Sequence, residues 1–174
     1  YDVQSGEINI DGVNIKKWNS GNLRSQIGFV PQDMFLFSDT IENNIHFGNT
    51  EEETDTDAAS FARMSSIHQE IMGFPEEYDT VVGERGVTLS GGQKQRISIA
   101  RALAKMPNML ILDDSISAVD AATEKDIEKN LQQFLEGKTS IIITHRIFTH
   151  FKFDNILVLD KEKIAGSGTH ENLL

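Results

Sequence analysis

The sequence has 174 residues, with 16 lysines and arginines against 27 aspartates and glutamates, so its formal net charge at pH 7 is −11. This length suits one domain with a substantial core, and the charge argues against a nucleic-acid binder held mainly by phosphate contacts. Because cysteine is absent, we expect no disulfide and no thiolate metal site. The apolar runs fall far short of the roughly 18 residues that a membrane span needs, so we expect no such span. We expect no signal peptide either, because the first residues lack a basic region and an apolar region.

The first predicted elements are a hairpin, a strand and a helix. Residues 6–10 and 13–15 flank Asp11-Gly12, a pair typical of a tight hairpin turn, and residues 27–30 form a short apolar strand. Residues 57–72 carry apolar side chains at steps of three and four, which predicts one amphipathic helix.

The second half of the sequence predicts alternating helices and strands, followed by a hairpin. The expected elements are a helix over 93–105, a strand over 109–112, a helix over 122–135, a strand over 140–144, and hairpin strands over 156–159 and 163–165. Two buried apolar strands flanking one helix indicate a βαβ crossover and a parallel sheet covered on both faces. The helix-rich region of about 38–105 interrupts the strands, so we interpret it as a helical subdomain.

Charge is unevenly distributed along the chain. The acidic cluster within 51–57 is typical of a solvated loop and helix start. Residues 85–112 contain no acidic side chain and five basic ones, namely Arg85, Lys94, Arg96, Arg101 and Lys105. Composition alone leaves open whether this basic island binds an anion or forms salt bridges within the protein.

Two carboxylates follow the apolar strand of residues 109–112. Ligands of parallel sheets bind outside the carboxyl ends of the strands, where Asp113 and Asp114 would lie. One carboxylate there can hold Mg²⁺ and another can orient a water. The alternative is that these residues only cap the next helix.

The octapeptide LSGGQKQR at 89–96 combines a serine and two glycines with the start of a helix. Glycines let backbone N–H groups approach phosphate oxygens, and a helix N-terminus favours an anion. A serine-capped helix after a glycine turn is the structural alternative, but it does not require this octapeptide.

These segments resemble the motifs of ATP-binding cassette (ABC) proteins. LSGGQKQR resembles the signature motif, LILDDSISAVD the Walker B motif and D-loop, IITHR the switch histidine, VPQD the Q-loop, and TVVGERG at 80–86 the X-loop of exporters. The five motifs occur in the family's order and cover nearly the whole chain. The basic island would then lie near nucleotide phosphates at a cassette dimer interface.

The resemblance implies a role for each matching residue. Asp113 would bind Mg²⁺, largely through water, and Gln32 would contact Mg²⁺ and the attacking water. His145 would contact the γ-phosphate of ATP, Asp114 would take the catalytic carboxylate position, and Asp120 would communicate between two sites. The residues that would close over ATP bound to the opposite cassette are Ser90, Gly91, Gly92 and Gln93.

The resemblance also implies a fold and a function. The fold would be α/β, P-loop NTPase-like, with a mostly parallel sheet, an antiparallel part and an inserted helical subdomain at about 38–105. Residues 1–174 would be a partial nucleotide-binding domain of an exporter that couples ATP binding and hydrolysis to substrate transport. It would lie at the cytoplasmic face of a membrane, with a second cassette and a transmembrane domain as partners. The alternatives are a soluble, non-transporter ABC ATPase and a non-catalytic subunit that uses its signature motif in trans.

Two features depart from the family pattern. No Walker A motif occurs, and in the family the P-loop, its strand and its helix precede the position of Tyr1. We therefore expect the core to lack its P-loop and this chain alone to be inactive. The family's catalytic glutamate is replaced by Asp114, whose carboxylate lies roughly 1–1.5 Å further back, which resembles the degenerate site of heterodimeric exporters.

Overall fold

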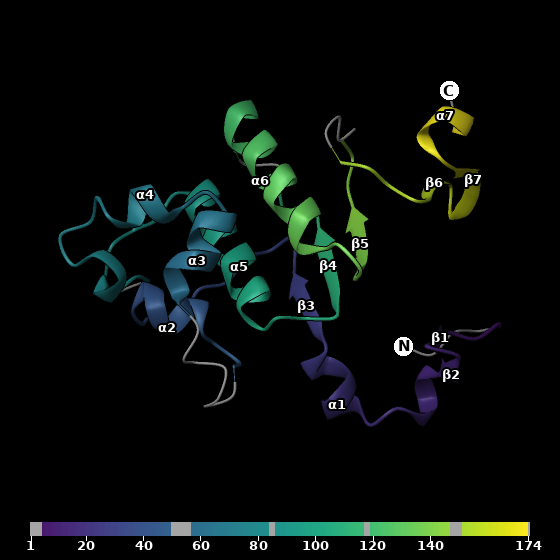
Figure 1. The fold of residues 1–174 in the computed structure, drawn as a ribbon, viewed down its shortest axis with the longest axis horizontal. Helices are drawn as coiled ribbons and strands as arrows, with labels where there is room; N and C mark the ends of the chain where they lie inside the picture. Colours follow the sequence, from purple (N-terminus) through teal and green to yellow (C-terminus); the bar gives the residue numbers. More distant parts are fainter. Residues whose placement is uncertain (1–4, 50–56, 84–85, 117–118, 147–150, 174) are drawn as a thin grey trace.

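The computed structural model describes residues 5–49, 57–83, 86–116, 119–146 and 151–173 (Figure 1). Its strands are β1 (Asn9–Ile10), β2 (Val13–Asn14), β3 (Ile27–Val30), β4 (Met109–Asp113), β5 (Thr139–Ile143), β6 (Ile156–Asp160) and β7 (Lys163–Gly168). Its α-helices are α1 (Ser20–Ser25), α2 (Ile41–Ile45), α3 (Ala58–Met64), α4 (His68–Ile71), α5 (Gly91–Ala104), α6 (Ala121–Phe134) and α7 (His170–Leu173). Two short 3₁₀ turns, η1 (Ile15–Lys17) and η2 (Glu77–Asp79), complete the described elements.

A parallel sheet in the order β3-β4-β5 forms the centre of the α/β fold. Val30 pairs with Leu112, which in turn pairs with Ile142, so the three strands end at the same edge. The helix α6 connects β4 to β5, as a parallel pair requires. The predicted strands and their crossover helix are therefore confirmed.

Two antiparallel hairpins complete the strands. The pair β1-β2 turns at Asp11 and Gly12, both with positive φ, as the tightest hairpin turns require. The pair β6-β7 turns at Lys161 and Glu162, which also have positive φ. Both predicted hairpins are confirmed, although β7 extends to Gly168.

The long helix α5 connects the sheet to the other helices. In Figure 1 it lies between β3 and the group formed by α2, α3 and α4, and it contacts β3, α2 and α3. Ile97, Ile99 and Leu103 are fully buried along it. Its close approach to β3 needs a glycine, because a Cβ at Gly28 would lie 2.8 Å from the carbonyl oxygen of Ala102.

The last turn of α5 is fixed to the beginning of β3. The Lys105 ammonium donates hydrogen bonds to the carbonyl oxygens of Arg24 and Ile27, at 3.1 and 3.0 Å. These carbonyls lie in α1 and at the first residue of β3. The C-terminal end of α5 is therefore attached to the amino end of the strand.

The prediction of one helix over 57–72 is wrong. The structure has two helices, α3 and α4, separated at Ser65–Ile67, and Ser66 has a φ of 57°. A left-handed residue cannot continue an α-helix, so the chain turns there. The helical spacing survives because Phe61, Ile67 and Ile71 are still buried in the same core.

The expectation of a sheet covered on both faces is also wrong for the described residues. Val30, Leu110 and Leu112 are buried on one face. On the other face, Phe29 is 53% exposed and Ile141 is 46% exposed. The strand β5 is consequently half-exposed rather than buried. Among the described residues, every helix is too short or too polar to cross a bilayer.

Candidate functional site

The sheet register brings four predicted site residues to one edge. Asp113 is the last residue of β4 and pairs with Ile143, and Asp114 follows it. Gln32 comes two residues after the end of β3, and His145 comes two residues after the end of β5. Because the three strands are parallel, these side chains follow the carboxyl ends, where ligands of such sheets bind.

Asp114 occupies a sharp turn in the chain. Its φ is 44°, a left-handed conformation that aspartate adopts more readily than most residues. Its N–H donates a 2.8 Å hydrogen bond to the carbonyl of Ile143, which fixes the turn against β5. Asp113 and Asp114 are both half-buried, so solvent reaches the two carboxylates.

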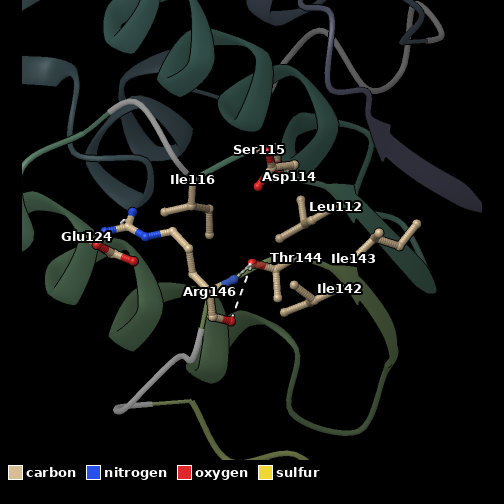
Figure 2. A pocket seen from close by; sticks show the side chains of 9 residues that line it. All are labelled: Leu112, Asp114, Ser115, Ile116, Glu124, Ile142, Ile143, Thr144 and Arg146. Atoms are coloured by element: carbon tan, nitrogen blue, oxygen red, sulfur yellow. Dashed lines mark hydrogen bonds and ion pairs between the residues drawn. The ribbon is translucent and has the colours of Figure 1, made fainter. Parts of the chain in front are cut away.

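The predicted switch histidine lies beside an ion pair that the sequence did not signal. His145 is exposed, and the preceding Thr144 accepts a 3.0 Å hydrogen bond on Oγ1 from the N–H of Arg146. The Arg146 guanidinium reaches Glu124 of α6 at 3.3 Å (Figure 2). The ion pair therefore ties the turn that carries His145 to the crossover helix.

A small cavity of about 10 Å³ lies between these groups and the end of β4. Its lining includes Asp114, Ser115, Glu124 and Arg146 (Figure 2). This volume is near the minimum for one water molecule, so the cavity cannot hold a nucleotide. Ser115 is buried, and its hydroxyl has no hydrogen-bond partner in the described part of the chain. Only its adjacency to the two aspartates could have signalled it.

The signature residues form the first turn of α5. Gly91 and Gly92 belong to the helix itself, and Ser90 is its N-cap. The Ser90 Oγ accepts a 3.2 Å hydrogen bond from the N–H of Gln93, and the Gln93 Oε1 accepts a 2.9 Å bond from the N–H of Ser90. This reciprocal pair is a capping box, and it leaves the Ser90 O–H able to donate outward.

The space over the signature turn is open. A Cβ placed on Gly91 would meet no atom within 4 Å. The N–H groups of the first two helical residues have no acceptor within their own helix, and the dipole adds a partial positive charge there. The turn therefore has the chemistry for binding an anion, with Gly91 keeping the approach clear.

Asp120 caps the helix α6. Its carboxylate accepts hydrogen bonds from the N–H groups of Ala122 and Thr123 and from the Thr123 hydroxyl. The Thr123 side-chain hydrogen bond, followed by the bond from its N–H, lowers the pKa of Asp120. Residues 117 and 118 of the predicted D-loop lie outside the described residues, as do residues 84 and 85 of the predicted X-loop.

Three members of the basic island are engaged inside the chain. Arg96 pairs with Glu70, Lys105 binds the two carbonyls at β3, and Arg101 is half-buried. Within the chain these three side chains have structural contacts, and the expectation that the island lies near nucleotide phosphates at a cassette interface stays a prediction. Lys94 is exposed, and Arg85 lies outside the described residues.

Arg101 joins α5 to the segment after Gln32. Its guanidinium donates to the carbonyl and side-chain oxygens of Asn44, both at 2.7 Å, and to the carbonyl of Phe35 at 2.8 Å. The group also lies over the rings of Phe37 and Phe47, at 5.6 and 5.7 Å. Burial lowers the pKa of Arg101 to about 10. Sequence reasoning missed this contact because its members are 57 and 66 positions apart.

The structure thus gathers the predicted residues into two groups. The sheet edge carries Gln32, Asp113, Asp114 and His145, and the first turn of α5 carries Ser90, Gly91, Gly92 and Gln93. The two groups therefore lie on different elements, the carboxyl ends of the strands and the beginning of α5.

Comparison with known proteins identifies the family. The family described as ABC transporter matches residues 1–117, about two-thirds of the sequence. The chain belongs to the ABC transporter family. Its α/β fold is that of the family's ATP-binding domain, since it superimposes with a TM-score of 0.89 on the structure of a bacterial Atm1-family ABC exporter with ATP bound. That match has 42% identity and covers 99% of this chain and 30% of the exporter chain.

Curated relatives of this chain are named as ABC transporters or export proteins. It is 48% identical over 174 residues to ABC transporter B family member 24, mitochondrial, of Arabidopsis thaliana. It is 47% identical to a putative multidrug export ATP-binding/permease protein of Staphylococcus aureus. All 174 residues align in both cases, and the chain spans 25% and 30% of the two relatives.

Proposed function

We propose that this chain is part of the nucleotide-binding domain of an ABC exporter that couples ATP binding and hydrolysis to transport across a membrane. Family membership supports ATP binding as its chemistry. The observation that carries the proposal is the sheet register, which brings Gln32, the two aspartates and His145 to one carboxyl edge. Phosphoryl transfer to water depends mainly on positioning and charge neutralisation, which such a set supplies.

The donors at this edge fit Mg²⁺ bound together with ATP. Carboxylate and amide oxygens suit this hard cation, and Asp113 and Gln32 provide them. The described residues contain no cluster of three or more His, Asp or Glu side chains that could hold a metal by themselves. This agrees with the usual magnesium site, in which one or two protein ligands are completed by phosphates and water. When bound, Mg²⁺ supplies charge neutralisation to the phosphates.

The open face of the sheet supports the inference that a P-loop strand and helix, encoded outside this sequence, complete the core. Phe29, Ile141 and Ile143 lie on one face and are about half-exposed. An apolar face of this kind is normally buried by other segments, and the P-loop strand and helix of the family are segments that could pack there. We therefore infer a core of which the described sheet is one part, with about 38–105 as its helical subdomain.

The proposed partners are a second cassette and a transmembrane domain. The open signature turn, with Ser90 and the two glycines, would close over ATP held by the second cassette. Asp120 would lie near the interface and respond to the opposite site. The transmembrane domain would place this chain at the cytoplasmic face of the membrane, with Gln32 relaying changes between the two parts.

The presence of aspartate at position 114, in place of the family's glutamate, supports the proposal that this is the slowly hydrolysing, degenerate site of a heterodimer. A carboxylate shortened by one methylene holds the attacking water less well, and small misplacements cost heavily in rate. The site built on these Walker motifs would hydrolyse slowly, while the signature motif here would serve the partner's site. Asp114 is also compatible with the alternative that the protein is a non-catalytic subunit, which contributes only its signature motif.

The test measures phosphate release by the full-length protein with MgATP. We expect His145→Ala to lower single-turnover phosphate release at the site built on this chain's own Walker motifs by at least about tenfold, because a group that stabilises transition-state charge is lost. The matched control is His170→Ala, since His170 is also exposed but lies on α7. A parent protein that neither binds nor hydrolyses ATP would contradict the proposal.

A further inference from the structure

Glu70 of the short helix α4 contacts two residues of the signature helix. Its Oε1 pairs with Nη1 of Arg96 at 2.6 Å, and its Oε2 accepts a 2.9 Å hydrogen bond from Nε2 of Gln93. The two partners lie 23 and 26 positions further along the chain, in the first two turns of α5. One carboxylate therefore spans the beginning of the helix.

Both partners are themselves bonded to the signature turn. The Gln93 side chain that donates to Glu70 accepts from the N–H of Ser90 through its other atom, Oε1. Arg96 donates through Nε to the carbonyl of Gly92 at 3.2 Å. The carboxylate of Glu70 is thus connected, through one side chain each, to the cap and to the second glycine.

The break between α3 and α4 contributes to this arrangement. The carbonyl of the left-handed residue Ser66 accepts a 2.8 Å hydrogen bond from Nη1 of Arg96. The Arg96 side chain is only 10% exposed, whereas that of Glu70 is 42% exposed. Arg96 consequently depends on Glu70 and Ser66 to satisfy its buried charge, because an unpaired buried charge is costly.

We propose that Glu70 is a positioning residue for the signature turn. It fixes the rotamer of Gln93, and through it the capping box, so that the Ser90 hydroxyl and the glycine N–H groups keep the geometry that an anionic ligand requires. This inference rests on the proposed function, in which that ligand is the nucleotide phosphate held by a second cassette. Glu70 itself touches no nucleotide in this arrangement.

The first experiment compares Glu70→Ala with Glu76→Ala in the full-length protein. Glu76 is an exposed carboxylate in the same region and serves as the matched control. We expect Glu70→Ala to lower kcat for ATP hydrolysis by about tenfold with a smaller change in KM, because misplaced groups lose rate steeply. The control keeps the parent rate, and both variants keep most of the parent Tm.

A second pair of variants separates positioning from simple support of Arg96. Glu70→Gln keeps an oxygen for Arg96 but turns an NH₂ group toward the NH₂ group of Gln93, so we expect kcat to fall. Adding Gln93→Glu restores a donor–acceptor pair and keeps an acceptor for the Ser90 N–H. The double variant should therefore recover kcat relative to Glu70→Gln, with Gln93→Glu alone completing the cycle.

Hydrogen exchange provides a readout that needs no ATP. Glu70→Ala should speed exchange of the Ser90 and Gln93 amides severalfold, while amides in the middle of α5 keep their protection. Unchanged exchange at these two amides, or parent-like kcat in Glu70→Ala, would overturn the inference. A parent protein without ATPase activity but with the expected exchange pattern would instead refute the proposed function and leave the Glu70 contact standing.

Discussion

The signature turn and the sheet edge differ in how they are held in place. The turn is fixed by the chain's own contacts, with a capping box, a buried helix behind it and Glu70 across its first two turns. At the sheet edge, Gln32 and His145 are exposed, and one face of the sheet below them is open. Under the proposed function, this chain preforms the signature turn for a partner's nucleotide, whereas the sheet edge needs further parts to hold a nucleotide of its own.

The strongest test of this difference between the signature turn and the sheet edge is to measure ATP binding by the isolated 174-residue chain. We expect at least about a 100-fold loss of affinity relative to the full-length protein, because the anion cradle of the P-loop is missing. Isothermal titration calorimetry with MgATP measures this directly. Stoichiometric binding with a micromolar Kd would show that the sheet edge is sufficient without that loop.

The next prediction concerns the contacts of Arg101 in the last turn of α5. Arg101→Ala should lower the free energy of unfolding by about 2–3 kcal/mol, since it leaves the oxygens of Asn44 and Phe35 without a charged donor. Chemical denaturation of the full-length protein measures the change. Lys94→Ala, at an exposed site of the same helix, should change it by less than about 0.5 kcal/mol. Equal effects in both variants would contradict the role assigned to Arg101.

A substitution at Asp114 tests whether its short side chain limits hydrolysis at the sheet edge. Asp114→Glu in the full-length protein should raise hydrolysis at this cassette's own site by about tenfold, because the longer side chain restores the reach of the carboxylate. Single-turnover measurement of phosphate release isolates that site. Asp113→Glu is the matched control and should not increase the rate. No increase for Asp114→Glu would remove the argument for a degenerate site.

The smallest expected effect is at the cap of α6. Hydrogen bonds from Thr123 lower the pKa of Asp120 in the folded state, so its contribution is present above the unfolded pKa and is lost as pH falls through the folded pKa. Asp120→Ala should therefore lower Tm slightly at pH 7 and change it less at strongly acidic pH. Parallel melts of Asp126→Ala, an exposed residue of α6, provide the control.

Local patterns predicted the central elements well. The apolar run before Asp113 and the apolar residues of α6, which recur at steps of three and four, determine their structure within short segments, so β4 and α6 were predicted to within a residue or two. Short helices were missed, because α1 and α2 have only six and five residues and depend on their caps, Asn19 and Thr40. The Ser66 break was also hidden, since a left-handed serine preserves the apolar spacing on both sides.

The site was predictable as residues but not as contacts. The motifs named Gln32, Asp113, Asp114 and His145, and the register of a parallel sheet then required that they share an edge. Nothing in the sequence paired Glu70 with Gln93 or Arg146 with Glu124, because these partners lie on different elements. The exposure of β5 was missed because burial depends on which segments pack above a strand.

The attachment of Lys105 to the beginning of β3 gives α5 a mechanical property. A helix of 14 residues is about 20 Å long, and this one is held at one end by carbonyls of Arg24 and Ile27. Its other end, which carries Ser90 and the glycines, is held by Glu70 of α4, so α5 is a rigid link between the beginning of β3 and the signature turn. A rotation of this rigid link by a few degrees about its β3 end, with α4 moving along, would shift the signature turn by about 1–2 Å, comparable with the tolerance of a hydrogen bond.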